Sequence, residues 1–275
     1  RGDIFIIALP IAWRRWVFPK PTPAYKNNGL YVTLGLLATD KAAAWANWLL
    51  EPTMKFSKLT NDIVLATTKN KEDDILEEIA NKNKIKCFRG SEQNVLERMY
   101  QCSKKFNGDY IVRITGDNPL QDPYLIDSAL KIANKKKCDY VTNTLTPTFP
   151  LGYPIEIINF KTLEKIYRNK KDANSKEHVT YDLCTNPNKY HVEEIFAPKK
   201  LDRPSWRLTV DYPEDLKLIK IIYKNLFKTK KIIKYRDVIL YLDNNPSLLN
   251  INKKYYTKKY FWTKLKEWYK ITTRH

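Results

Sequence analysis

Two aspartates stand where short apolar segments end, a placement that suits the binding of a metal ion. Asp117 follows the expected strand 110–114 and a tight turn that contains Gly116, and Asp211 follows the expected strand 208–210. In open α/β sheets, ligands bind just outside the carboxyl ends of the strands. Mg²⁺ takes one or two carboxylates together with phosphate oxygens. The pair therefore indicates a Mg²⁺ site facing a nucleotide phosphate, provided that the fold brings the two aspartates together.

Each aspartate also has a purely structural interpretation. Asp117 can bond its own backbone in the turn before Pro119. Asp211 can serve as an N-cap-like residue for the helix expected over 216–227. The residues that suit the first turn of that helix are Pro213, Glu214 and Asp215. From these segments alone, both interpretations stay open.

The elements that must position these residues alternate between strand and helix. Strands are expected at 4–9, 62–67, 85–88, 110–114 and 139–143, and helices at 42–50, 72–81, 94–106 and 123–134. This alternation predicts a three-layer α/β fold, with a mostly parallel sheet and helices on both faces. Between 144 and 200 the pattern changes to short strands, expected at 155–158 and 191–196, and proline-containing turns. That change indicates a small β-rich insertion.

Several separate motifs occur in a fixed order along the chain. They are Gly-Asp-x-Pro at 116–119, Glu-His-Val-Thr at 177–180, and Trp-Arg-Leu-Thr-Val-Asp-x-Pro-Glu-Asp-Leu at 206–216. Further matching segments are 61–68, 88–92, 95–98 and 152–156. Together they resemble the cytidylyltransferase family, and in particular its spore coat polysaccharide biosynthesis protein F branch. The resemblance covers roughly residues 57–252 and implies a nucleotide-diphospho-sugar transferase-like fold.

The resemblance also implies an activity. A member of this family would join CTP to an acidic sugar, giving a CMP-sugar and pyrophosphate for surface polysaccharide or glycoconjugate synthesis. It implies Mg²⁺ held by Asp117 and Asp211, with Arg15 and Lys20 on the phosphates. It places Arg89, Ser91, Arg113 and Gly116 on the nucleotide side, and Glu156, Glu177 and His178 on the sugar side. It further implies a homodimer, with residues 144–200 helping to form the dimer and the sugar pocket.

Three of these residues have a second interpretation that the sequence leaves open. Arg113 can face the nucleotide or pair with a neighbouring acid. Glu156 alternates with isoleucines, so it is either a pocket residue or an exposed glutamate on the sheet. Glu177 and His178 are expected to open a helix, where His178 is either a general base or a helix-start histidine held by hydrogen bonds.

The segment after the first expected strand departs from the family pattern. Arg15 and Lys20 can match basic residues of the phosphate-binding loop, with Lys20 one position out of register. The glycine and serine of that loop are absent, and Trp13 and Trp16 stand nearby. Glycine lets a loop bring its backbone N–H groups close to phosphate. Three alternatives follow: loss of nucleotide activation, an altered segment 10–56, or a loop refolded around different basic residues.

Charge bears on the choice of partner. The chain carries 49 Lys and Arg against 30 Asp and Glu, a formal net charge of +19. Such a balance can indicate nucleic acid or an anionic membrane, but here the lysines are spread along the whole chain, so no nucleic-acid partner is expected. The basic and aromatic tail 253–275 suits a helix docked through Phe261, Leu265 and Trp268, stacking on single-stranded nucleic acid, or an interfacial helix.

Cysteine usage and hydropathy suggest a compartment. Four cysteines show neither metal-ligand spacing nor a disulfide framework, which favours a reducing cytoplasm. No apolar run reaches the length of a membrane span, and no secretory leader is evident. We expect one cytidylyltransferase-like domain over 1–252, followed by the tail. The alternatives to the enzyme are a catalytically impaired relative that binds nucleotide or a partner, and a basic RNA- or membrane-binding module.

Overall fold

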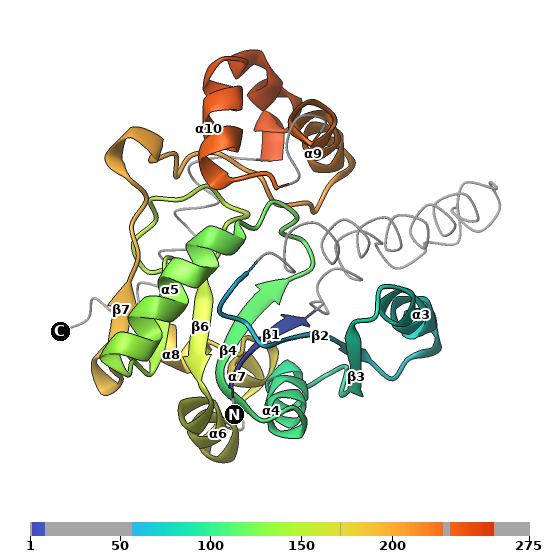
Figure 1. The fold of residues 1–275 in the computed structure, drawn as a ribbon, viewed down its shortest axis with the longest axis vertical. Helices are drawn as coiled ribbons and strands as arrows, with labels where there is room; N and C mark the ends of the chain where they lie inside the picture. The colour runs from blue at the N-terminus through green and yellow to red at the C-terminus, as the bar shows by residue number, and fades with distance from the viewer. Residues whose placement is uncertain (1, 9–56, 171, 228–231, 256–275) are drawn as a thin grey trace.

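The computed structural model describes residues 2–8, 57–170, 172–227 and 232–255, and within them seven strands form one sheet in the order β3-β2-β1-β4-β6-β5-β7 (Figure 1). The strands are β1 (Gly2–Ala8), β2 (Asp62–Thr68), β3 (Lys86–Gly90), β4 (Gly108–Thr115), β5 (Tyr140–Thr142), β6 (Glu156–Asn159) and β7 (Val192–Glu194). All described neighbours pair in parallel except at β6, which runs antiparallel to both β4 and β5. The expected mostly parallel sheet is confirmed.

Helices cover both faces of this sheet. They are α3 (Asp74–Lys82), α4 (Val95–Lys105), α5 (Pro123–Lys136), α6 (Phe160–Asn169), α7 (Ala173–Glu177), α8 (Tyr181–Thr185), α9 (Pro213–Leu226) and α10 (Tyr235–Asp243). Short 3-10 helices are η3 (Lys71–Asp73), η4 (Pro187–Lys189), η5 (Lys199–Leu201), η6 (Pro246–Ile251) and η7 (Lys253–Tyr255). No helix in these described ranges is long and apolar enough to cross a membrane.

Strand β4 shows why the layers form. Tyr110, Val112 and Ile114 project into one apolar core, which also contains residues of α3, α5, α9 and α10. Ile111 projects into a second core, with residues of α4, α6 and α8. Because side chains alternate across a strand, β4 supplies both cores at once, and this confirms the three-layer α/β architecture.

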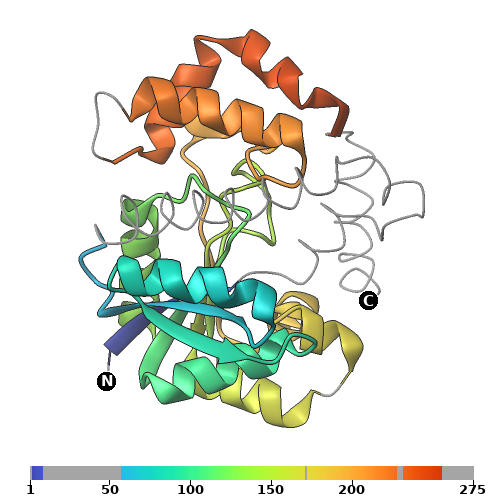
Figure 2. The ribbon, with the colours of Figure 1, turned by 90° about the vertical axis from the view of Figure 1, so that its right-hand side faces the viewer.

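Helices α9 and α10 form a lobe beyond the sheet, visible at the top of Figure 2. Asp122 links the lobe to the sheet. One of its carboxylate oxygens accepts a hydrogen bond from the Tyr124 N–H (2.8 Å) at the start of α5. The other accepts one from the Tyr235 N–H (2.7 Å) at the start of α10. The Tyr223 hydroxyl of α9 donates to the Pro119 carbonyl (2.8 Å). The lobe is therefore fastened to the loop that follows β4.

The expected strand 208–210 is wrong. The bridge in this region lies one residue earlier, between Arg207 and Leu151, and the Leu208 N–H donates to the Leu151 carbonyl (2.6 Å). Thr209 lies in a bend, and the hydrogen-bond partners of the segment are loop residues rather than another strand.

Gly152 allows the close approach of this segment. Its φ is +115°, and a Cβ there would lie 2.4 Å from the Leu208 carbonyl carbon. Gly152→Ala should therefore lower the free energy of unfolding by about 1–3 kcal/mol through backbone strain alone, measured by urea denaturation. Lys137, a non-glycine residue with φ +54°, is the matched control, because the reverse change to glycine there should not destabilise the protein. Lys137→Gly should be neutral or stabilising, and equal effects of the two changes would contradict the explanation.

Residues 144–200 hold both expected strands, β6 and β7, but the β-rich insertion is wrong, because α6, α7 and α8 lie between the strands and both strands belong to the main sheet. The helix expected to open at Glu177 and His178 is wrong. The helix α7 begins earlier, at Ala173, because Asp172 caps it by accepting the Ser175 N–H (2.9 Å). It ends at Glu177, and His178 follows it. The expected helix 42–50 and the tail beyond residue 255 lie outside the described residues.

Candidate active site

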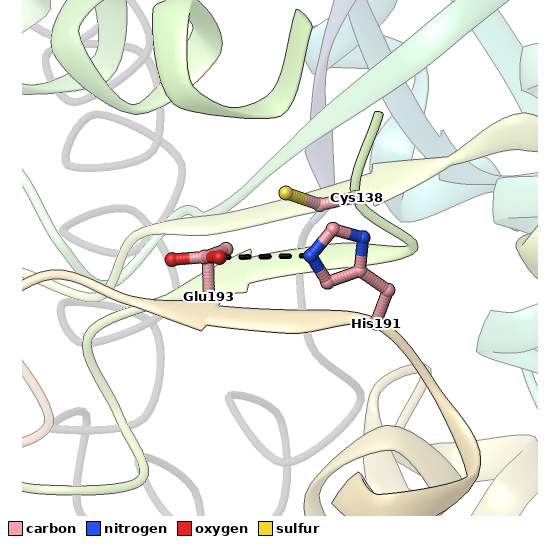
Figure 3. A group of neighbouring side chains, drawn as sticks. All are labelled: Cys138, His191 and Glu193. Atoms are coloured by element: carbon pink, nitrogen blue, oxygen red, sulfur yellow. Dashed lines mark ion pairs between the residues drawn. The ribbon is translucent and has the colours of Figure 1, made fainter. Parts of the chain in front are cut away.

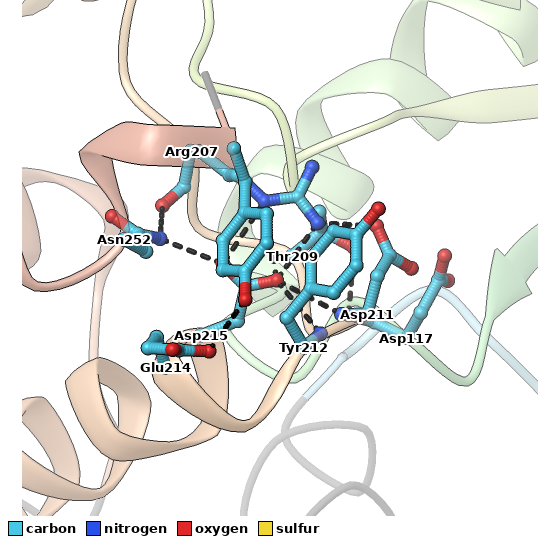
Figure 4. A network of polar contacts seen from close by, with 9 residues as sticks. Asp117, Arg207, Thr209, Asp211, Tyr212, Glu214, Asp215 and Asn252 are labelled. Carbon is cyan, nitrogen blue, oxygen red and sulfur yellow. Dashed lines mark hydrogen bonds and ion pairs between the residues drawn. The ribbon is translucent and has the colours of Figure 1, made fainter. Parts of the chain in front are cut away.

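The turn after β4 brings the two aspartates together. The Asp117 carbonyl accepts hydrogen bonds from the Val210 N–H (2.9 Å) and from the Thr209 hydroxyl (3.0 Å). These bonds lock the segment before Asp211 against the turn. In Figure 4 the Asp117 and Asp211 carboxylates lie side by side. They come from the carboxyl end of β4 and from the chain leading into α9.

The Asp117 carboxylate is poorly neutralised by the protein. Its Oδ1 is buried and has no hydrogen-bond partner among the described residues. Burial raises the pKa of Asp117, a hydrogen bond from the Thr115 side chain offsets part of this rise, and the charge of Asp211 raises the pKa again. A buried carboxylate oxygen without a hydrogen-bond partner is costly. An orphaned carboxylate oxygen beside a second carboxylate therefore fits the donor set of a hard divalent cation such as Mg²⁺.

Asp211 is held by an ion-pair network behind the site (Figure 4). Its Oδ2 pairs with the Arg207 guanidinium, and its side chain stays about one third exposed, at 35%. Arg207 also binds Asp215 through Nε (2.9 Å) and Nη2 (2.7 Å). Asp215 is completely buried and accepts the backbone N–H groups of Asp211 (3.0 Å) and Tyr212 (3.1 Å). Arg207 therefore fixes the position of Asp211.

A second layer joins the chain after α10 to this network. The Asn252 side-chain amide donates to Asp215 (2.8 Å) and to the Arg207 carbonyl (3.0 Å). The Tyr212 and Tyr255 rings stack 3.7 Å apart. The first residues of the basic tail are thus packed against the start of α9.

Sequence reasoning missed the roles of Arg207 and Asn252, and gave Asp215 only a capping role. Asp215 does cap α9, but it is also the buried partner of Arg207. The regular spacing of Arg207, Asp211 and Asp215 was the available signal. Nothing in the sequence pointed to Asn252, whose contacts depend on the return of the chain after α10.

Arg113 and Glu156 form a buried polar cluster on the face of the sheet covered by α4, α6 and α8. The Arg113 guanidinium pairs with Glu156, which also accepts hydrogen bonds from the Thr180 hydroxyl (2.7 Å) and the Tyr140 hydroxyl (3.2 Å). The pairing expected for Arg113 as one alternative is confirmed. The exposed-glutamate alternative for Glu156 is wrong, since this residue is only 6% exposed. Arg113 carries its charge near Asp117, where it lowers the pKa of that carboxyl.

This buried pair gives a stability prediction. Glu156→Gln should lower the free energy of unfolding by about 3 kcal/mol, because it leaves the Arg113 charge buried without a carboxylate. The matched control is Glu177→Gln, since Glu177 is exposed at the end of α7. Urea denaturation should show almost no change for the control. A Glu156→Gln variant as stable as this control would rule out the buried pair.

The remaining candidates fall into three groups. Arg89 is bound by Asp74 (2.8 Å) and Glu77 (2.7 Å) of α3, and Ser91 accepts the Asn94 N–H (3.1 Å). These contacts give both residues local structural roles. Gly116 lies in the turn beside Asp117. Glu177 is the last residue of α7, and His178 follows it. In the Glu-His-Val-Thr motif, Thr180 is the residue bonded to Glu156. Arg15 and Lys20 lie outside the described residues.

Comparison with known proteins supports one family. The cytidylyltransferase family profile matches residues 46–236. An uncharacterized protein of Methanocaldococcus jannaschii is 41% identical over 209 residues, which cover 75% of this chain and 83% of that protein. The spore coat polysaccharide biosynthesis protein SpsF of Bacillus subtilis is 33% identical over 192 residues, 70% of this chain and 78% of that protein.

Solved structures agree with these sequence relatives. A cytidylyltransferase from Leptospira borgpetersenii superposes with a TM-score of 0.72 at 28% identity, covering 90% of this chain and 95% of that one. A CMP:2-keto-3-deoxy-manno-octonic acid synthetase complexed with CTP has a TM-score of 0.50 at 10% identity, covering 82% and 99% of the two chains. At that identity, the second likeness concerns the fold.

Proposed function

The chain belongs to the cytidylyltransferase family, and we propose that it transfers the cytidylyl group of CTP to an acidic sugar, releasing pyrophosphate. The observation that carries the proposal is the orphaned, buried oxygen of Asp117 beside Asp211. The name of the Bacillus subtilis relative supports a product used in polysaccharide synthesis. The net charge of +19 favours anionic substrates such as a triphosphate and an acidic sugar.

Asp117 and Asp211 would hold Mg²⁺ through their carboxylate oxygens, among them the unpartnered Oδ1 of Asp117. When bound, the ion supplies charge neutralisation and lowers the pKa of the attacking hydroxyl. Phosphoryl-type transfer depends mainly on positioning and electrostatics, and the protein contributes both. Arg207 fixes Asp211 from behind, and the bonds from Thr209 and Val210 hold the turn that carries Asp117.

The other candidates take supporting roles in the proposal. Arg15 and Lys20 are proposed to contact the phosphates, and Glu177 and His178 the sugar. Gly116 is proposed to let the nucleotide approach the backbone next to Asp117. The contacts of Arg113 and Glu156 favour a supporting pair beneath the site. Residues 144–200 are proposed to complete the sugar pocket and a homodimer.

Pyrophosphate release tests the proposal directly. Purified protein is incubated with Mg²⁺, one of the four ribonucleoside triphosphates, and a panel of nonulosonic and other acidic sugars. Release is expected with CTP and at least one acidic sugar, and only when both are present. No release with any combination would overturn the proposed activity.

One second candidate is favoured by a specific observation. The phosphate-loop segment lacks its glycine and serine and contains Trp13 and Trp16. A relative that has lost activity would bind CTP, seen by calorimetry, without turnover on any sugar. A basic module would instead show no CTP binding, with salt-sensitive retention on RNA or anionic liposomes.

A further inference from the structure

A second group of metal-binding side chains lies at the other end of the sheet from the candidate active site. Cys138 and His191 stand just before β5 and β7, and Glu193 lies within β7 (Figure 3). The Cys138 sulfur, one His191 ring nitrogen and one Glu193 oxygen all lie within 4.8 Å of one another. The proposed cytidylyl transfer uses none of these residues.

The backbone holds the three residues in register. The His191 carbonyl accepts the Asp139 N–H (2.9 Å), and the His191 N–H donates to the Asp139 carboxylate (2.9 Å). Glu193 is paired with Val141 in the parallel ladder of β5 and β7. His191 and Glu193 are two residues apart in extended chain, so their side chains point to the same face. The cluster is therefore built on the sheet rather than on a free loop.

The donor types select a particular class of ion. Thiolate, imidazole and carboxylate are the ligands that Zn²⁺ takes in proteins, and three of them leave a fourth position open. Ligand atoms around a tetrahedral Zn²⁺ lie about 3.5 Å apart. The His191 Nε2 and the Glu193 Oε1 already stand at 3.6 Å. A hard ion such as Mg²⁺ prefers oxygen ligands to a thiolate.

The contacts that compete with a metal are weak. Lys136 reaches the Glu193 carboxylate at 2.8 Å, but its side chain is half exposed, at 50%. Exposed ion pairs of this kind contribute about 0–1 kcal/mol. The Cys138 sulfur makes a long contact, 4.0 Å to the Ile132 carbonyl. Burial raises the pKa of the Cys138 thiol, and the charge of Glu193 raises it further. Metal binding would therefore release a proton from this thiol.

We propose that Cys138, His191 and Glu193 bind Zn²⁺ or a chemically similar divalent ion, with water or an external ligand in the fourth position. The ion would fasten the short strand β7, which is at the end of the strand order, to β5 and to the end of α5. Zinc binding at this site is independent of the proposed transferase activity.

Cobalt serves as the probe. Chelator-treated protein titrated with Co²⁺ should develop a near-ultraviolet thiolate-to-cobalt band together with visible bands of tetrahedral cobalt. The site at Asp117 and Asp211 has no sulfur in its proposed ligand set and cannot produce the first band. Cys138→Ser should abolish it, whereas Cys87→Ser, which changes a half-buried cysteine on β3, should leave it intact.

Two surface variants keep the proposal falsifiable if Cys138→Ser fails to fold. His191→Ala should weaken Co²⁺ binding by more than about tenfold, the usual cost of losing even an outer partner. Lys136→Met should tighten binding, because it removes the competing cation. The proposal would be overturned if the wild type showed no thiolate-to-cobalt band at millimolar Co²⁺. It would also be overturned if the band persisted in His191→Ala and the affinity for Co²⁺ did not change in Lys136→Met. Neither result depends on whether CTP is turned over.

Discussion

Asp117→Asn is expected to lower kcat for pyrophosphate release by about 10³-fold while leaving the protein fully folded. Asparagine has the same shape but cannot give a divalent cation the charge that Asp117 offers beside Asp211. Losing one group that stabilises transition-state charge costs about 10²–10³-fold in rate, and saturating Mg²⁺ keeps weaker metal binding from adding to this. The measurement is steady-state kinetics of pyrophosphate release at saturating Mg²⁺. Asp109→Asn, at the opposite end of β4, is the control and should retain activity.

Stability should change in the opposite direction from activity. Because the folded protein raises the pKa of Asp117, it binds that proton more tightly than the unfolded chain does. The ionised carboxyl therefore reduces stability as pH rises through its folded pKa. Without metal at neutral pH, Asp117→Asn should melt at or above the wild-type temperature, and this advantage should vanish in acid. A variant that is active, or that melts well below the wild type, would contradict the assignment.

Arg207→Met is expected to cost about 3–5 kcal/mol of the free energy of unfolding. The change leaves the completely buried Asp215 without its cation, and an uncompensated buried charge carries a penalty of that size. Urea denaturation measures the effect. Arg203→Met is the matched control, because its pair with Asp243 is 29% and 32% exposed and should contribute about 1 kcal/mol or less.

A double variant separates the pair from simple loss of packing. Adding Asp215→Asn to Arg207→Met removes both buried charges, keeps an oxygen that can accept the N–H groups of Asp211 and Tyr212, and should recover much of the lost stability, since no uncompensated buried charge is left. The double variant should nevertheless stay impaired in catalysis, because Asp211 has lost the guanidinium that holds it. Additive stability losses for the two changes would show that Arg207 and Asp215 do not act as a pair.

The layers and the central pair of aspartates were predictable from sequence because they depend on local signals. Alternating apolar residues fix β4, Asn94 caps α4, and Asp122 with Pro123 opens α5. The order of the family motifs predicted that Asp117 and Asp211 share one site, and the structure places their side chains next to each other. Each of these predictions used either residues that lie close together in the sequence or the order of motifs that a known family shares.

The failures share one physical cause: the burial and the hydrogen-bond partners of these residues are set by elements that lie far away in the sequence. Glu156 occupies the strand position of an outward residue, but the helices on that face bury it against Arg113. His191 had no context in sequence, because the pairing of β7 with β5 brings it near Cys138. The 208–210 segment reads as a strand, yet the loops at Leu151 and Asp117 take its hydrogen bonds. Long-range packing decides such cases.

Manganese binding measured by electron paramagnetic resonance tests the paired carboxylates most directly. Nucleotide-free protein, Asp117→Asn, Asp211→Asn and the double variant are each titrated with Mn²⁺, with Mg²⁺ as competitor. We predict one Mg²⁺-displaceable site in the wild type, lost in either single variant, with no further loss in the double variant. Wild-type binding by either single variant would show that the two aspartates do not share an ion.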